Sequence, residues 1–301
     1  ITIALAWCAD HVAFGPVKHN RRQRLIVCTV VIIILLAGFA GLRTRCNDTA
    51  TYRYSYKLLT EKLWEASDKS VGSNPLFNWV NYRLKMHGVS TQNFLMFWAF
   101  LTVGCYLIFA HKYSVNFPLS VFLLFTTGCY TFAFAGIKQA AAVGISVIAT
   151  MFALKKKWLL FAVGILIATL IHPYSLMYLA VPFMTFKPWT KITYWMLAAF
   201  IAAGFLLRPL LGTAVNITTL LGEEYTVSSF TGDGVNMFRV LVCNVPMVLS
   251  FLYRKKLFAD SSKVENLAVN LTMLNGAIMF DGLFGTANYF ARLANYFLIF
   301  Q

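Results

Sequence analysis

The stretch "LLAGFAGLRTRCNDTATYRYSY", Leu35 to Tyr56, decides the fold, because a long uncharged segment ends there within a few residues. Arg43 and Arg45 close the apolar run, and Asp48 and an alternating series of tyrosines follow. An abrupt change of this kind is typical of a helix that leaves the hydrocarbon core of a membrane. The stretch therefore predicts a spanning helix whose polar end carries groups able to bind a ligand.

The composition indicates an integral membrane protein. The chain has 301 residues, of which 59% are hydrophobic, 16% aromatic and only 12% charged, which lies outside the usual range of soluble domains. The formal net charge is +15, but the cations lie in short clusters between apolar runs, a pattern that reports membrane topology and argues against a nucleic-acid partner. The six cysteines show no metal-ligand or disulfide spacing, so we expect neither a metal nor a disulfide framework.

Apolar runs near the length of a spanning helix, roughly 20 residues, recur from end to end, and the first of them is interrupted by Asp10 and His11. They lie at 1–15, 25–42, 94–110, 115–135, 139–154, 158–171, 173–186, 192–207, 237–253, 266–284 and 288–301. We divide the run 158–186 in two because Pro173 disfavours a helical conformation at His172. The prediction is an all-α polytopic integral membrane protein with about 10–11 transmembrane helices, which form a single transmembrane domain over residues 1–301.

Clusters of lysine and arginine mark alternate turns, and short cytoplasmic turns collect such cations. The clusters are Lys18 to Arg24, Lys112, Lys155 to Lys157, Lys187 with Lys191, and Arg254 to Lys263. With these turns inside, segments 43–93 and 208–236 become extracytoplasmic loops.

The first of these loops contains a second helical pattern. In "PLFNWVNYRLKMHG", Pro75 to Gly88, apolar residues recur at helical spacing opposite polar ones: Leu76, Trp79, Val80 and Leu84. This pattern predicts an amphipathic helix that lies in the membrane interface.

Charged groups gather at the predicted outer face. Arg43, Arg45 and Asp48 begin the first loop, and further ionisable residues lie within a turn or so of predicted helix ends: Lys138, His172, Arg239, Asp281 and Arg292. Ionisable residues inside a membrane-spanning segment are costly unless they face a wet or protein-lined cavity. We therefore expect a convergent, mostly cationic pocket, which would suit a polyanionic ligand because arginine holds phosphate oxygens in a bidentate fork.

Four segments in order resemble the EpsG family of exopolysaccharide and O-antigen polymerases. They are "GLRTRCNDTATYRYSYKLL" (41–59), "FAGIKQAAAVGISVIATMFALKKKWLLFAVGILIATLIHPYSLMYL" (134–179), "NMFRVLVCNVPMVLSFLYRKK" (236–256) and "NYFARLANYF" (288–297). The sequence departs from the family pattern at Lys138, where an arginine is expected.

The resemblance implies a Wzy-type polymerase, a membrane glycosyltransferase with a GT-C-like helical fold that needs no metal or other cofactor. Such an enzyme would join undecaprenyl-diphosphate-linked oligosaccharide units into O-antigen, capsule or exopolysaccharide for the bacterial cell surface. It would be a multi-pass protein of the plasma (inner) membrane with its active site facing the periplasm or exterior. Its partners would be the lipid-linked glycan donor and acceptor and membrane lipid, with a chain-length regulator and a flippase as further candidates.

Glycosyl transfer assigns roles to the outer-face residues. Cations stabilise the charge that develops on the diphosphate, which we assign to Arg43 and Arg239 with support from Lys138 and Arg292. A carboxylate or imidazole removes the acceptor proton, which we assign to Asp48 or His172. The catalytic candidates are therefore Arg43, Asp48 and His172, and the substrate-binding candidates are Arg239, Lys138, Arg292, Arg45 and Tyr52.

Several candidates also have a purely structural interpretation. Arg43 and Arg45 can extend to the lipid head groups, and Asp48 can cap a helix that begins at the next residue. His172 can be an ordinary helix-end histidine, and Arg292 can pair with Asp281 between two helices. The alternating tyrosines can belong to an interfacial aromatic belt.

The alternative function is transport, for example by a flippase that moves the same lipid-linked sugar. Transporters often contain paired internal halves with broken helices and place their charges near the midplane. The sequence shows no internal repeat, and its charges lie at one face. These observations favour the enzyme.

Overall fold

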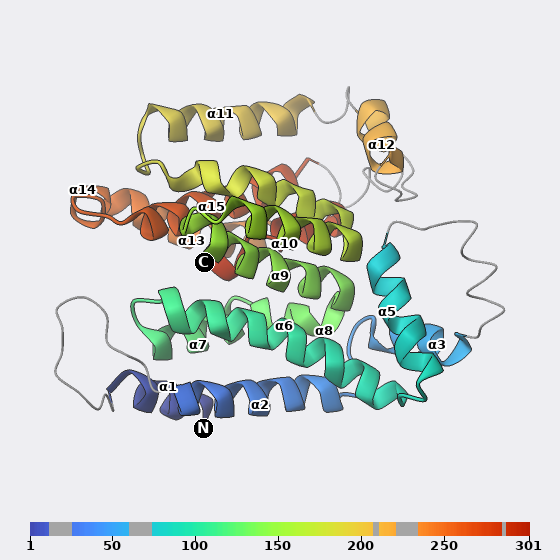
Figure 1. The fold of residues 1–301 in the computed structure, drawn as a ribbon. Coiled ribbons are helices and arrows are strands. Elements are labelled where there is room, and N and C mark those ends of the chain that lie inside the picture. The colour runs from blue at the N-terminus through green and yellow to red at the C-terminus, as the bar shows by residue number, and fades with distance from the viewer. Residues whose placement is uncertain (12–25, 60–73, 207–210, 221–233, 285–286) are drawn as a thin grey trace. The chain divides into compact units, whose positions relative to one another are not determined.

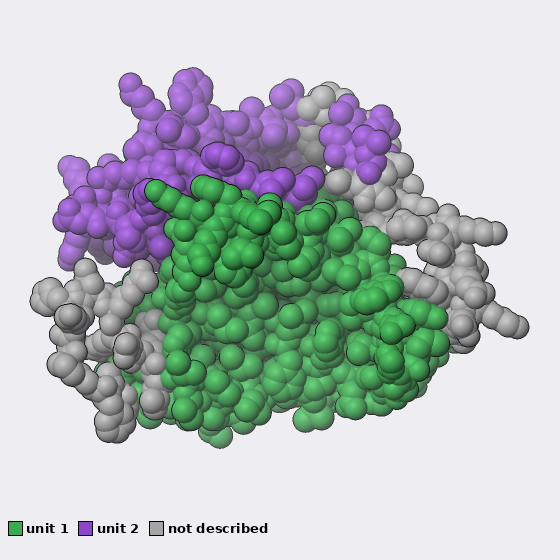
Figure 2. All heavy atoms as spheres, in the orientation of Figure 1, with its two compact units in different colours: residues 1–175 green, residues 176–301 purple. Residues whose placement is uncertain are grey.

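The computed structural model describes residues 1–11, 26–59, 74–206, 211–220, 234–284 and 287–301. Every regular element in these ranges is a helix, which confirms the all-α prediction for the described part of the chain. The chain divides into two compact units, Ile1–Ser175 and Leu176–Gln301, which are coloured separately in Figure 2. We describe each unit by itself.

The first unit contains nine described α-helices (Figure 1). They are α1 (Thr2–His11), α2 (Ile26–Leu42), α3 (Thr49–Leu58), α5 (Pro75–Met86), α6 (Thr91–Tyr113), α7 (Phe117–Thr126), α8 (Cys129–Ala135), α9 (Ile137–Leu154) and α10 (Trp158–Ile171). Helix α2 packs along α6, α6 along α9, and α9 along α10. Helix α9 is buried on most of its surface, and its small residues allow this close packing: Ala140, Ala141, Ala142 and Gly144.

Polar side chains of the first unit satisfy helix ends. The carboxylate of Asp10, which interrupts the first predicted run, accepts a hydrogen bond from the Phe117 backbone nitrogen at 2.9 Å. The Asn116 side chain accepts one from Leu119 nitrogen at 3.0 Å. Together they satisfy backbone donors in the first turn of α7, which otherwise have no partner.

The predicted break between residues 171 and 173 is present. Helix α10 ends at Ile171, and His172 is extended with φ −153° and ψ 119°. The following segment, Pro173–Thr185, is a 3₁₀ helix that includes Pro182, so the expected spanning α-helix at 173–186 is wrong. Proline lacks the backbone donor and its ring clashes with the preceding turn, which disfavours a continuous α-helix here.

The second unit is organised around α15 (Lys263–Asp281). Its other helices are α11 (Lys191–Leu206), α12 (Leu211–Leu220), α13 (Met237–Leu252), α14 (Arg254–Leu257), α16 (Ala287–Ala294) and a 3₁₀ turn, Leu298–Phe300. The Asn270 side chain donates to the carbonyls of Met184 and Phe186, both at 2.8 Å. These hydrogen bonds satisfy the end of the 3₁₀ segment.

Fewer of the described helices are long and apolar enough to cross a membrane than the sequence predicted. Among the described residues, α6 and α9 are long and apolar enough, and α7 with α8 would make a third span broken by a 47° bend. Helices α2, α10, α11 and α13 are apolar but have 10–17 residues, or roughly 15–25 Å of length. The described part of the chain thus gives two or three full-length spans, against the about 10–11 expected from the sequence, because several apolar runs form short helices or a 3₁₀ segment.

The loop predicted at 43–93 contains α3 and α5. Helix α5 forms where the amphipathic pattern predicted it, and Leu76, Val80 and Leu84 pack against a buried core cluster of the first unit. Trp79 is 50% exposed, while Phe77 and Asn81 are the most buried residues of the helix. The inward face is therefore rotated away from Trp79. Its location in a membrane interface stays a prediction, and the loop predicted at 208–236 lies largely outside the described residues.

Candidate active site

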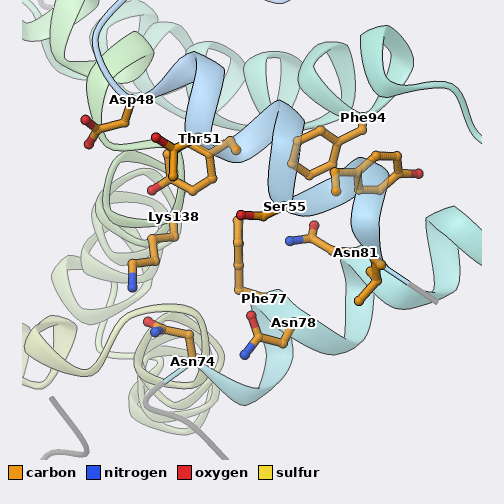
Figure 3. Close-up of a pocket in the computed structure, with 12 residues that line it drawn as sticks. Asp48, Thr51, Ser55, Asn74, Phe77, Asn78, Asn81, Phe94 and Lys138 are labelled. Atoms are coloured by element: carbon orange, nitrogen blue, oxygen red, sulfur yellow. The ribbon is translucent and has the colours of Figure 1, made fainter. Parts of the chain in front are cut away.

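Helices α3 and α5 border a cavity of about 760 Å³ (Figure 3). Its lining residues come from four parts of the first unit: Asp48, Thr51, Tyr52, Ser55, Tyr56 and Leu59 from α3 and its ends; Asn74, Phe77, Asn78 and Asn81 from α5 and its start; Phe94 from α6; and Lys138 from α9. A cavity of this size is typical of small-molecule sites.

The helical period of α3 selects which tyrosines reach the cavity. The lining positions run from Asp48 to Leu59 in steps of three and one residues, which is one face of a helix. Tyr52 and Tyr56 therefore line the cavity, whereas Tyr54 is 65% exposed on the other side. The alternation in the sequence does not place all the tyrosines on one face, because this segment is a helix and not a strand.

Aromatic side chains form a buried core cluster beneath the cavity. Tyr56 stacks on Phe94 with ring centroids 4.3 Å apart, and its hydroxyl donates to the Val89 carbonyl at 2.9 Å. Phe77 lies 4.8 Å from the Trp98 ring. The cluster also includes Leu95, Ile137, Ala141, Ala142 and Ile171. Burial raises the pKa of Tyr56. The cluster joins α3, α5, α6, α9 and α10, so the cavity has a packed base.

Asp48 occupies the N-cap position of α3 without acting as a cap. The helix begins at Thr49, as the structural interpretation of Asp48 requires, but the Asp48 side chain accepts no capping hydrogen bond. It is exposed and lines the cavity instead. The chain reaches it through Cys46 (φ 123°) and Asn47 (φ 44°), conformations that are costly for residues with a Cβ.

Arg43 is held at the junction of α2 and α3, next to the cavity lining. Its Nε donates to Thr49 Oγ1 at 3.0 Å, and one terminal nitrogen donates to the Ala40 carbonyl. The guanidinium lies 5.3 Å from the centre of the Phe134 ring. Burial lowers the pKa of Arg43, and nearby Cys46, Tyr130 and Tyr52 partly offset this effect. Arg45 is exposed in the same turn.

Among the described residues that line the cavity, Lys138 and Asp48 are the two charged ones. Lys138 is half-buried in the first turn of α9. The described part of the lining therefore carries one positive and one negative side chain, and the mostly cationic pocket expected from the sequence stays a prediction. Arg43 and Arg45 lie in the α2–α3 junction and are not among the described lining residues.

His172 lies close to the core cluster and not in the lining. It follows Ile171, a member of the cluster, and only 8% of its surface is exposed. Its backbone nitrogen donates to the Ala168 carbonyl at 2.8 Å, and its ring lies 5.7 Å from the ring of Tyr174.

The two remaining candidates, Arg239 and Arg292, belong to the second unit, and their part in the site stays a prediction. Arg239 is exposed in the first turn of α13, and Arg292 is exposed in α16. Asp281, the suggested structural partner of Arg292, is buried at the end of α15. Its Oδ1 has no hydrogen-bond partner within the described part of the chain.

Sequence reasoning missed the amide side of the cavity. Asn74, Asn78 and Asn81 follow at i, i+4 and i+7 in "NPLFNWVN", so the helical repeat could have identified them. Gln92 of α6 was also missed. It donates to the carbonyls of Gly41 and Arg43 and accepts from Arg53 at 3.0 Å, which ties the end of α2 to α3.

No group of three or more histidine, cysteine, aspartate or glutamate residues in the described ranges could hold a metal ion. The sequence was also compared with known proteins. No curated protein and no solved structure matches it. The sequence pattern of the EpsG family matches residues 26–301, a range that contains the whole cavity lining and every candidate site residue. Because the match covers most of the sequence, the chain belongs to the EpsG family.

Proposed function

We propose that this protein is a Wzy-type polymerase that joins undecaprenyl-diphosphate-linked oligosaccharide units into a bacterial surface polysaccharide. Membership of the EpsG family suggests an exopolysaccharide-related polymerase. The observation that carries the proposal is the cavity between α3 and α5. It combines one carboxylate, one amine and several neutral amides and hydroxyls, which is a suitable set for a glycan substrate.

In the proposed reaction, an acceptor hydroxyl attacks the anomeric carbon of the donor sugar. The new glycosidic bond forms as the bond from that carbon to the phosphate oxygen breaks, and the diphosphate leaves with the electron pair. Asp48 takes the hydroxyl proton. Its carboxylate suits this role because it faces the cavity and is not used to cap α3, and a general base must reach the proton it removes.

Cations near the carboxylate stabilise the leaving group. Lys138 lines the same cavity as Asp48, and Arg43 is fixed beside it by Thr49 and Ala40. Both are partly buried, where their interaction with a developing charge is stronger than in water. The reaction as proposed uses these side chains and no metal. Arg239 and Arg292 stay candidates for substrate binding, and His172 stays the alternative candidate for the base.

Helix length supports an active site that faces the outside of the cell. Lys138 at the start of α9 lines the cavity, and α9 has 18 residues, which extend over roughly 27 Å at about 1.5 Å per residue. Lys155, Lys156 and Lys157 therefore lie about a membrane thickness from the cavity. Lysine-rich turns stay in the cytoplasm, so the cavity would open to the exterior. A chain-length regulator and a flippase would work beside it.

The test is complementation of a deletion strain with Asp48→Asn at matched protein levels. We expect polymer synthesis to fall about 100-fold or more, because the general base is lost, and single repeat units to replace the polymer ladder on gels. Arg83→Gln, an exposed change on α5 outside the lining, serves as the control. Wild-type chain length in Asp48→Asn would remove Asp48 from the mechanism. Lipid-linked units trapped in the cytoplasm of the deletion strain would indicate a flippase.

A further inference from the structure

Asn81 is oriented by its partner so that its amide donors face the cavity. It is 9% exposed, and its Oδ1 accepts from Trp98 Nε1 at 2.9 Å. An indole nitrogen can only donate, so the atom bound to Trp98 must be the amide oxygen. The NH₂ group is left to point into the cavity, toward Ser55 of the opposite helix (Figure 3).

Further neutral polar groups face the same space. Asn78 and Ser55 line the cavity, and their side chains make no hydrogen bond with any described residue. Both are exposed to the cavity and to solvent. An amide and a hydroxyl each offer donors and acceptors, which are the groups needed to bind sugar hydroxyls or an acetamido group.

The two charged side chains of the described lining lie away from the Asn81 amide. In Figure 3, Asp48 and Lys138 lie on one side of the view, and Asn81 and Phe94 lie on the other. No cation from α5 is among the lining residues. A sugar carboxylate or phosphate bound against α5 would lose hydration without gaining an opposite charge, which is unfavourable.

We propose that the α5 side of the cavity is a subsite for a neutral sugar of the repeat unit, with Asn81 as a specificity-determining residue. The Asn81 amide donates to a hydroxyl or acetamido oxygen of the sugar, and Asn78 and Ser55 bind neighbouring groups. Tyr52, the half-exposed aromatic residue of the lining, supplies ring surface. This inference rests on the proposed function, because it assumes that the cavity holds the glycan.

Asn81→Asp separates this role from a structural one. The carboxylate still accepts from Trp98, so the buried hydrogen bond is kept, while both cavity donors are lost. We expect polymer synthesis in the complemented strain to fall about tenfold or more, as loss of a hydrogen bond to a buried polar group predicts. Arg83→Gln changes the net charge by the same amount on the same helix and should keep wild-type synthesis. Wild-type polymer in Asn81→Asp would overturn the proposal.

Asn78→Ala provides a second variant in case Asn81→Asp fails to fold. Its side chain is exposed and makes no described hydrogen bond, so truncation should leave the fold intact. We expect a loss of about threefold to tenfold in polymer synthesis. Full activity in this variant, at normal protein levels, would contradict the proposed subsite even if Asn81→Asp cannot be purified.

A binding measurement distinguishes failure of the subsite from failure of the polymerase assignment. Purified wild-type protein in detergent is mixed with the methyl glycosides of glucose, galactose, N-acetylglucosamine and glucuronic acid, and contact is detected by saturation-transfer NMR. We expect at least one neutral glycoside to bind, the glucuronide not to bind, and Asn81→Asp and Asn78→Ala to weaken binding. Such binding in a protein that makes no polymer would refute the proposed function and keep the subsite. Normal polymer synthesis with no neutral-sugar binding, or with preference for the glucuronide, would refute the subsite alone.

Discussion

At the residue scale, Asp48 occupies the N-cap position of α3, but its side chain lines the cavity and does not cap the helix. An aspartate before a helix normally satisfies a backbone donor of the first turn, but Asp48 makes no such bond. The unusual backbone of Cys46 and Asn47 turns the chain just before it. Strain of this kind persists only where the surrounding structure imposes it and is concentrated at functional sites.

Substitutions of Lys138 test whether the positive charge of this side chain is needed for polymer synthesis. The resemblance to the family led us to expect an arginine at this position, so Lys138→Arg should keep at least half of wild-type polymer synthesis. Lys138→Met keeps the approximate length and removes the charge, and we expect a loss of about tenfold to 1,000-fold, typical for a group that stabilises developing charge. Polymer length on gels, at matched protein levels, is the measurement. Equal activity of the Met and Arg variants would show that the Lys138 charge has no role.

At the element scale, small residues set the spacing of α9 and α10, and thereby the base of the cavity. A Cβ on Gly164 would lie 2.7 Å from Ala149 Cβ, so the two helices touch through their backbones. Ile171 at the end of α10 and Ile137 at the start of α9 both belong to the core cluster. Moving the helices apart would therefore disturb the residues beneath Tyr56.

Gly164→Leu should destabilise this packing by about 1–3 kcal/mol, the usual cost of inserting atoms into a filled interface. Thermal unfolding of the purified protein in detergent would measure the loss as a lower midpoint. Gly38→Ala in α2 is the control, because nothing lies within 4 Å of an added Cβ there. An unchanged midpoint for Gly164→Leu would show that α9 and α10 do not pack as closely as described.

At the scale of the whole molecule, the distribution of cations relates the cavity to the membrane. Within the first unit, Ser55 lines the cavity, and Lys155 follows the far end of α9. The separation of roughly 27 Å along α9 places the two residues at opposite ends of that unit. If the lysine turn is cytoplasmic, these residues lie on opposite sides of the membrane.

Cysteine labelling tests this sidedness in intact cells. On a background without the native cysteines, Ser55→Cys should react with an impermeant maleimide from outside. Lys155→Cys should react only after the membrane is opened. The opposite pattern would place the cavity in the cytoplasm and end the proposed outer-face reaction. Equal labelling of both residues from outside would contradict the membrane orientation of α9.

Local sequence was sufficient for much of the fold. Apolar runs and charge clusters predicted the helices and the turns between them, because hydrophobicity and backbone preferences act over a few residues. The break at His172 follows from Pro173 in the same way, and the sequence also identifies Asp48, Tyr52 and Lys138, which line one cavity.

Tertiary structure decided what depends on partners distant in the chain. Asp10 caps α7 across more than 100 residues of sequence, and Trp98 orients Asn81. The run 173–186 forms a 3₁₀ segment whose last carbonyls are bound by Asn270. A local sequence pattern cannot predict these pairings, because the hydrogen bonds and the buried contacts form only after the helices have packed.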